Sequence, residues 1–201
     1  MTLSNNKVIF LNGCTSSGKS SIIKAIQHES ESLWIACGID IFIQMMPYGR
    51  IDPYLTFTPE QNQRGPSVRV DSGPEGPKLF DALPQLATIL AAKGNNLIID
   101  EVLLNEKDLF SYAKYLKDFT VYYIGVFCDL EIMREREIFR RNRFIGLAND
   151  QIDRVHKGVL GSYDFRVDTT SISPSNAARL ILKFINESPA PKAFASLASN
   201  S

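Results

Sequence analysis

The sequence predicts a three-layer α/β domain, with a parallel β-sheet between two layers of helices. Short apolar or β-branched runs alternate along the chain with segments of helical periodicity, a pattern typical of parallel strands joined by right-handed helical crossovers. The strand-like runs are continuously apolar, as expected when helices cover both faces of a sheet. A length of 201 residues fits a single hydrophobic core.

The strand and helix signals follow one another in a regular order. The run KVIFLN precedes the helical stretch KSSIIKAIQHES, and LWIAC precedes DIFIQMM. NNLIID follows the helical stretch PKLFDALPQLATILAAKG. FTVYYIGVFC precedes LEIMREREIFRRNRF, and DFRVDT precedes SPSNAARLILKFINES. We therefore expect these strands to share one parallel sheet.

Two segments depart from this alternation. Residues 47–78 hold six of the ten prolines and four glycines, which predicts either a substrate-side insertion that covers the site or a mobile surface insertion. Residues 187–201 are small, polar and without periodicity, so we expect a disordered tail. The folded domain is expected to span residues 1–186.

The composition excludes several classes of function. Equal numbers of basic and acidic residues, 22 of each, leave no net charge to attract nucleic acid or an anionic membrane surface. No stretch approaches the roughly 20 apolar residues of a membrane span. Three cysteines without metal-ligand spacing indicate reduced thiols, and no apolar leader precedes the domain. We expect a cytoplasmic protein.

The stretch LNGCTSSGKSS carries the strongest functional signal. Gly13, Gly18, Lys19 and Ser20 satisfy the phosphate-binding pattern G-x-x-x-x-G-K-[ST] between an expected strand and an expected helix. Glycines let backbone N–H groups surround a polyphosphate, the lysine reaches the β- and γ-phosphates, and the hydroxyl ligates Mg²⁺. A glycine-rich helix cap is the alternative. We expect ATP and Mg²⁺ to bind here, with these residues forming the loop: Gly13, Cys14, Thr15, Ser16, Ser17, Gly18, Lys19, Ser20 and Ser21.

Three acidic residues lie at or just after the ends of two other expected strands. Asp100 is the main candidate for holding Mg²⁺ together with Ser20, and the adjacent Glu101 is the second candidate. Asp40 opens the helix after LWIAC, where it either caps that helix or acts as the general base that accepts the proton of an attacking hydroxyl.

The stretch REREIFRRNR places Arg136, Arg140 and Arg143 at i, i+4 and i+7, so on a helix the three guanidinium groups share one face. A transferring phosphoryl group is an anion that such a face would bind, and residues 140–150 are expected to form a closing lid. The alternative is a solvated helix with internal ion pairs. His28 is expected at the surface, and His156 is either structural or catalytic.

Together these motifs resemble the chloramphenicol phosphotransferase family of P-loop kinases. The resemblance is carried by LNGCTSSGKSS, WIACGIDIFIQMMP, NLIIDEVLL, VYYIGVFCDLE, RERE with the arginines after it, IGLA, and VHKGVLGSYDFRVDTT. It implies a five-stranded parallel sheet in the order 2-3-1-4-5, Asp40 as base and lid arginines at Arg136, Arg140 and Arg143. Related kinases imply that Thr169 lies near the adenine.

The expected function is an ATP-dependent phosphotransferase that moves the γ-phosphoryl group to a hydroxyl of a small molecule, with Lys19, Asp40, Arg136 and Arg140 as catalytic residues. The resemblance implies an antibiotic-resistance type of activity. Tyr54, Arg64 or Arg69 would contact the acceptor. The alternatives are a kinase for a nucleotide, a sugar or a shikimate-type metabolite and, more distantly, a non-catalytic nucleotide-binding switch.

Overall fold

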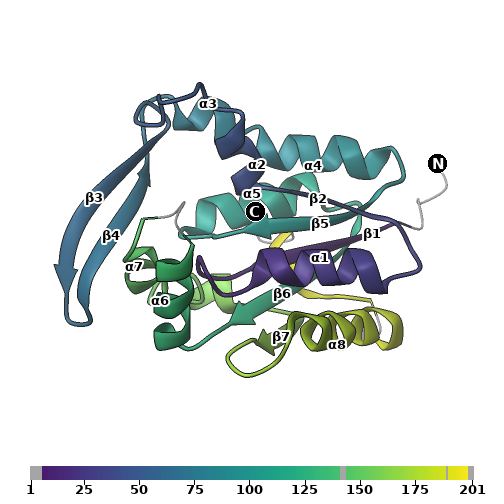
Figure 1. Ribbon diagram of the computed structural model, residues 1–201. Coiled ribbons are helices and arrows are strands. Elements are labelled where there is room, and N and C mark those ends of the chain that lie inside the picture. The colour runs from purple at the N-terminus through teal and green to yellow at the C-terminus, as the bar shows by residue number, and fades with distance from the viewer. Residues whose placement is uncertain (1–5, 141–143, 189, 199–201) are drawn as a thin grey trace.

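Five parallel strands form the central sheet of the computed structural model, which describes residues 6–140, 144–188 and 190–198 (Figure 1). The strands lie in the order β2-β5-β1-β6-β7. Numbered among themselves, they follow the predicted order 2-3-1-4-5, so the predicted fold class is confirmed. Their bounds are Trp34–Gly38 (β2), Asn96–Glu101 (β5), Lys7–Asn12 (β1), Thr120–Phe127 (β6) and Phe165–Asp168 (β7).

Strand β1 is central because it pairs on both sides, with Val8 opposite Leu97 of β5 and opposite Val121 of β6. The run from Val8 to Leu11 has no exposed surface. A strand covered on both faces must be apolar at every position, which explains the continuous apolar pattern. Because all five strands are parallel, their carboxyl ends meet at one edge of the sheet, where ligands bind in open α/β sheets.

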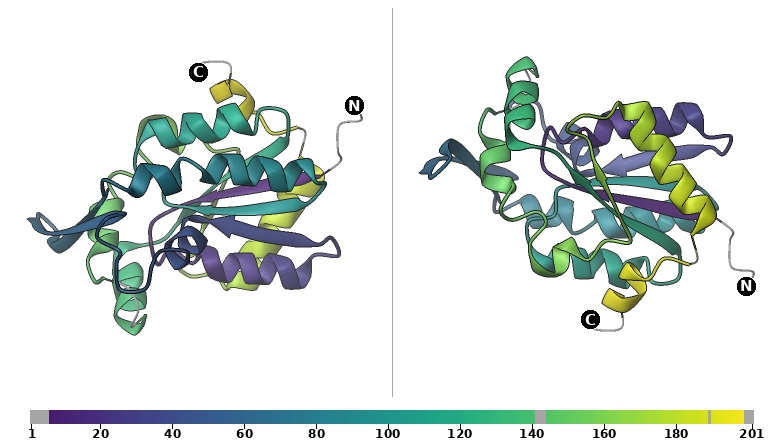
Figure 2. Two further views of the ribbon diagram at one scale, coloured as in Figure 1. Left: turned by 90° about the horizontal axis from the view of Figure 1, so that it is seen from above. Right: turned by 90° about the horizontal axis from the view of Figure 1, so that it is seen from below.

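Helices cover the two faces of the sheet (Figure 2). On one face pack α4 (Leu83–Ala92), α5 (Glu106–Tyr115) and α9 (Ala193–Ala198). On the other face pack α1 (Lys19–Glu29) and α8 (Pro174–Glu187). Each face has its own apolar cluster, so the predicted three layers are present.

Residues 47–78 contain an antiparallel hairpin of β3 (Leu55–Asn62) and β4 (Gly65–Ser72), followed by α3 (Gly76–Phe80). The hairpin extends away from the central sheet (Figure 1). The sequence analysis assigned no strand to this segment, which is rich in proline and glycine. In a two-stranded ribbon, however, each strand has an unpaired edge that tolerates proline, and Pro59 and Pro66 lie within the hairpin.

Two expectations about helices are wrong. The tail was expected to be disordered, yet α9 forms within it because Phe194 and Leu197 bury against the sheet. Helix α6 (Leu130–Phe139) ends before Arg140, which is its C-cap. Ile138 and Phe139 are exposed, so no packing supports a longer helix. After α6 come α7 (Leu147–Gln151), the 3₁₀ helix η1 (Gly158–Gly161) and β7.

Candidate active site

The loop between β1 and α1 has the backbone of an anion-binding nest. Gly18, the residue before α1, has φ 100°, and Ser16 has φ 58°. Left-handed residues beside helical ones turn successive N–H groups toward one point, and the amino end of α1 adds its partial positive charge there. Glycine at position 18 is required because other residues rarely adopt this φ. The loop predicted from the sequence therefore has the geometry that phosphates require.

Lys19 is held inside this loop. Its Nζ donates hydrogen bonds to the carbonyl oxygens of Gly13 at 2.8 Å and Cys14 at 3.0 Å, and lies 3.6 Å from Oδ1 of Asp100. The side chain is only 6% exposed. Such partners fix the ammonium group in the loop, so its charge faces any anion that enters.

Ser20 and Asp100 form the expected place for a divalent ion. The Ser20 hydroxyl donates to Oδ2 of Asp100 at 3.3 Å, and both residues line the same cleft. Across the residues that the structure describes, no group of three or more histidine, cysteine or acidic side chains forms a metal site. Mg²⁺ is usually held by one or two protein ligands, waters and substrate phosphates, so one hydroxyl and one carboxylate are ligands of the expected kind.

Glu101 does not join this site. It is buried on the opposite side of β5, where its Oε1 accepts a hydrogen bond of 2.7 Å from the hydroxyl of Tyr112. Burial raises the pKa of Glu101 to about 8. Neighbouring residues of a strand point to opposite faces, so only one of the two acids can face the loop. The geometry selects Asp100, and the second candidate is wrong.

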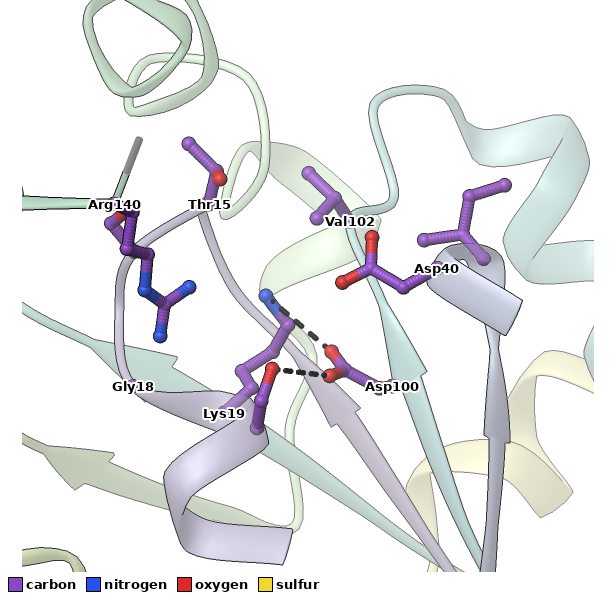
Figure 3. Close-up of a pocket in the computed structure, with 10 residues that line it drawn as sticks. Thr15, Gly18, Lys19, Asp40, Asp100, Val102 and Arg140 are labelled. Carbon is purple, nitrogen blue, oxygen red and sulfur yellow. Dashed lines mark hydrogen bonds and ion pairs between the residues drawn. The ribbon is translucent and has the colours of Figure 1, made fainter. Parts of the chain in front are cut away.

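Asp40 lies in the same cleft as the phosphate loop. The cleft is lined by Thr15, Lys19, Asp40, Asp100 and Arg140, among others. Figure 3 shows Asp40 and Arg140 approaching the cleft from opposite sides, with Lys19 between them.

Asp40 is the second residue of α2 (Ile39–Gln44), two positions after Gly38, which is the N-cap of this helix. A Cβ at Gly38 would lie 2.2 Å from the carbonyl oxygen of Asp100, so only glycine lets the two strand ends approach this closely. The residue type at position 38 therefore helps to place the carboxylate beside the loop.

The two described lid arginines occupy different positions. Arg136 donates to the carbonyl oxygens of Ser16 at 3.3 Å and Thr169 at 3.0 Å, so it fastens the phosphate loop to the end of β7. Arg140 lines both the cleft and a neighbouring cavity of about 220 Å³. Arg143 lies outside the described residues. Because α6 ends at Phe139, Arg136 and Arg140 do not share one helical face as expected.

The larger cavity adjoins the loop at Gly18 and Ser21 and is also lined by Thr169, Ile172 and Pro174. Thr169 is buried, and its hydroxyl donates to the carbonyl oxygen of Ser17 at 2.6 Å. A mainly apolar cavity beside a phosphate loop suits the base of a nucleotide. Thr169 lines this cavity, and its position near the base stays a prediction.

Three hydroxyls of the loop support phosphate binding. Oγ1 of Thr15 and the Oγ atoms of Ser16 and Ser17 are buried and have no hydrogen-bond partner within the described part of the chain. A buried polar atom without a partner is unfavourable unless a ligand or water satisfies it. The loop thus offers donors that a phosphate can use. The Cys14 thiol is different, because burial raises its pKa to about 12 and keeps it protonated.

His156 has a structural environment. Its ring stacks on Phe127 with the ring centroids 3.9 Å apart, and Nδ1 forms a 2.6 Å hydrogen bond with the Tyr163 hydroxyl. Burial lowers the pKa of His156 to about 4, which keeps the ring neutral at pH 7. His28 is exposed on α1, as expected.

Gln151 is a site residue that the sequence analysis missed. It ends α7, it is buried, and its Oε1 accepts a 2.7 Å hydrogen bond from the backbone N–H of Thr15 in the phosphate loop. The two residues are 136 positions apart, so no local pattern connects them. Only the stretch IGLA, which ends three positions before it, carried a family signal.

This loop, sheet order and cleft define the P-loop kinase class of α/β proteins. The family model described as chloramphenicol phosphotransferase-like protein matches residues 6–186, and the chain belongs to this family. A relative in Mycobacterium tuberculosis H37Rv, described as a putative O-phosphotransferase, is 29% identical over 197 residues. That alignment covers 94% of this chain and 86% of the relative.

Solved structures show the same fold. A sugar kinase from Janibacter superposes with a TM-score of 0.64 at 15% identity, covering 96% of this chain and 98% of the other. Shikimate kinase from Acinetobacter baumannii, solved with shikimate, gives 0.59 at 12% identity, with 93% and 98% covered. No helix in the described part of the chain is long and apolar enough to cross a membrane.

Proposed function

We propose that this protein is an ATP- and Mg²⁺-dependent kinase that transfers the γ-phosphoryl group of ATP to a hydroxyl of a small molecule. One observation carries the proposal: the Asp40 carboxylate lines the same cleft as the phosphate loop and Lys19. A binding protein needs the loop alone. A carboxylate beside the position of the terminal phosphate is the additional feature that transfer to an alcohol requires.

The charged residues of the cleft and Ser20 each have a role in the proposed transfer. Asp40 accepts the proton as the acceptor oxygen forms its bond to the γ-phosphorus, and the bond from that phosphorus to the β–γ bridging oxygen breaks, releasing ADP. Lys19 and the loop amides stabilise charge on the phosphates, and Arg140 neutralises the equatorial oxygens from the other side of the cleft. Mg²⁺, held by Ser20 and Asp100, would neutralise charge on the phosphate oxygens.

The lining of the cleft favours an acceptor with apolar groups. Ile39 and Val102 line the same cleft as Asp40, so part of its lining is apolar. Arg64 and Arg69 were expected to contact the acceptor, but each forms an ion pair, with Asp153 and Asp71 respectively.

The apolar part of the cleft lining favours a chloramphenicol-like alcohol over a nucleotide acceptor. Sugars and shikimate-type metabolites are the next acceptors to compare. An antibiotic acceptor would give the protein a resistance function.

The test is Asp40→Asn, assayed for transfer from γ-labelled ATP to a panel containing chloramphenicol, sugars, shikimate and nucleosides. Transfer should fall by roughly 10² to 10⁴, the scale for loss of a general base, while binding of the ATP analogue AMPPNP is retained. Asp118→Asn is the matched control, because Asp118 is exposed just before β6, at the opposite end of the sheet. Unchanged transfer in the Asp40 variant would remove this residue from the mechanism.

A further inference from the structure

Helix α7 lies between the β3–β4 hairpin and the phosphate loop. On the hairpin side, Nδ2 of Asn149 donates to the carbonyl oxygen of Pro66 at 2.6 Å. The backbone N–H of Val68 in β4 donates to the carbonyl oxygen of Gly146 at 3.0 Å. Figure 1 shows α7 between α6 and the hairpin strands. The hairpin is therefore fastened to α7 by hydrogen bonds at both the start and the middle of this helix.

The start of α7 is also fixed to α6. Glu137 is 1% exposed, and its two carboxylate oxygens accept hydrogen bonds from the backbone N–H groups of Gly146 at 2.9 Å and Ala148 at 2.8 Å. Nε of Arg134 donates to Oδ1 of Asn149 at 2.9 Å. A buried carboxylate with two charge-assisted bonds is a strong anchor. Consequently α7 forms a single unit with α6 and the hairpin.

The end of α7 contacts the phosphate loop through Gln151. This side chain is 4% exposed, and its 2.7 Å bond to the Thr15 N–H sets the orientation of the Cys14–Thr15 peptide, one peptide before Ser16, the left-handed residue of the loop. The Thr15 and Ser16 side chains line the cleft. A change in the position of Gln151 would therefore change the part of the loop that faces the phosphates.

We propose that Gln151 is a positioning residue for the phosphate loop, and that α7 transmits the position of the β3–β4 hairpin to this loop through Gln151. The inference rests on the proposed function, because it takes the loop to be the triphosphate site and the hairpin to lie on the acceptor side. The affinity for the triphosphate then depends on the hydrogen bonds of Asn149 with the hairpin and with Arg134.

The experiment measures the dissociation constants of Mg²⁺–AMPPNP and of AMP by calorimetry. Gln151→Met keeps the side-chain volume but removes the acceptor of the Thr15 N–H, and Asn149→Leu removes the bonds to Pro66 and Arg134. The matched control is Gln85→Met on the exposed side of α4. The double variant completes a cycle that separates coupled from independent effects.

Gln151→Met should raise the AMPPNP dissociation constant about tenfold, the scale for a buried N–H that loses its acceptor, and leave that of AMP within about twofold. Asn149→Leu alone should raise the AMPPNP dissociation constant several-fold. Added to Gln151→Met, it should have little further effect. General damage to the fold would weaken the binding of AMP as well. Wild-type AMPPNP affinity in Gln151→Met, or additive effects in the double variant, would overturn the inference.

A second measurement covers variants that fold poorly. Hydrogen exchange should show the Thr15 amide protected in the wild type and less protected in Asn149→Leu, and equal protection would overturn the coupling. Wild-type protein that binds AMPPNP but phosphorylates no acceptor would contradict the proposed function alone. Wild-type protein that binds no AMPPNP would overturn both.

Discussion

Replacing Arg136 by methionine should destabilise the protein, because Arg136 joins two segments far apart in the chain. Its guanidinium group bonds to Ser16 in the phosphate loop and to Thr169 after β7. Methionine retains the apolar part of the side chain, so the substitution mainly removes the hydrogen bonds and the charge. Both carbonyl oxygens would then lose a charged donor.

The magnitude follows from the geometry of the bonds. Only the contact from Nη2 to the Thr169 carbonyl oxygen, at 3.0 Å, has a good length. The contacts of Nη1 with the Ser16 carbonyl oxygen, Cys128 Sγ and Thr169 Oγ1, at 3.3, 3.3 and 3.4 Å, share one nitrogen and count together as one weak bond. One good and one weak charged bond are worth about 2 kcal/mol, which is about 4–8 °C in Tm for a chain of this size.

Urea denaturation and thermal melting of Arg136→Met measure this effect. Arg140→Met is the informative comparison: Arg140 lines the cleft and the larger cavity, so its loss should leave stability within about 0.5 kcal/mol but reduce transfer about 10³-fold or more. Arg50→Met, at an exposed position, controls for removing a surface charge. Wild-type stability in Arg136→Met, or a larger loss in Arg140→Met, would refute the division of roles.

Three further predictions concern charged or titrating side chains. Lys19→Met should raise the AMPPNP dissociation constant about 10- to 100-fold in calorimetry, because a charged hydrogen bond to phosphate is lost. Lys93→Met, at an exposed position, should leave this constant unchanged. Equal affinities of the two variants would count against the loop assignment. Glu101 has a raised pKa of about 8, so between pH 4.5 and 8 the folded chain binds more protons than the unfolded chain. The free energy of unfolding therefore falls as pH rises through this range. Glu101→Gln should flatten this pH dependence in urea titrations. His156 has a lowered pKa of about 4, so stability is lost as pH falls from 6.5 to 4; His156→Gln should remove that loss, and an unchanged slope would contradict the neutral buried ring.

Local sequence patterns were sufficient to predict the strands of the central sheet. The apolar runs of β1 and β5 and the glycines of the phosphate loop are consequences of conditions at each position: burial on both faces, and backbone angles that only glycine adopts readily. The hairpin was missed because strand propensity fails for a two-stranded ribbon containing Pro59 and Pro66. The helix of the tail was missed because its stability comes from burying Phe194 and Leu197 against a distant surface.

The candidate site was predicted unevenly. The sequence indicated that Asp100 and Glu101 end a strand, but the choice between them depends on which face of β5 looks toward the loop. Arg136 was predicted as a lid arginine, while the structure shows it bound to two carbonyl oxygens. Gln151 gave no signal of its own, because its partner lies in another part of the chain.

The sequence by itself determined the phosphate loop, the strand order through family resemblance, and the acidic side chains near the strand ends. The loop and the acidic side chains depend on residue type and on neighbours a few positions away, whereas the strand order was predicted from the resemblance alone. Only the tertiary structure decided which acid faces the loop, which arginine lines the cleft, and how α7 joins the hairpin to Thr15. Those choices are made by contacts between segments far apart in the chain, and such contacts exist only when the whole core has packed.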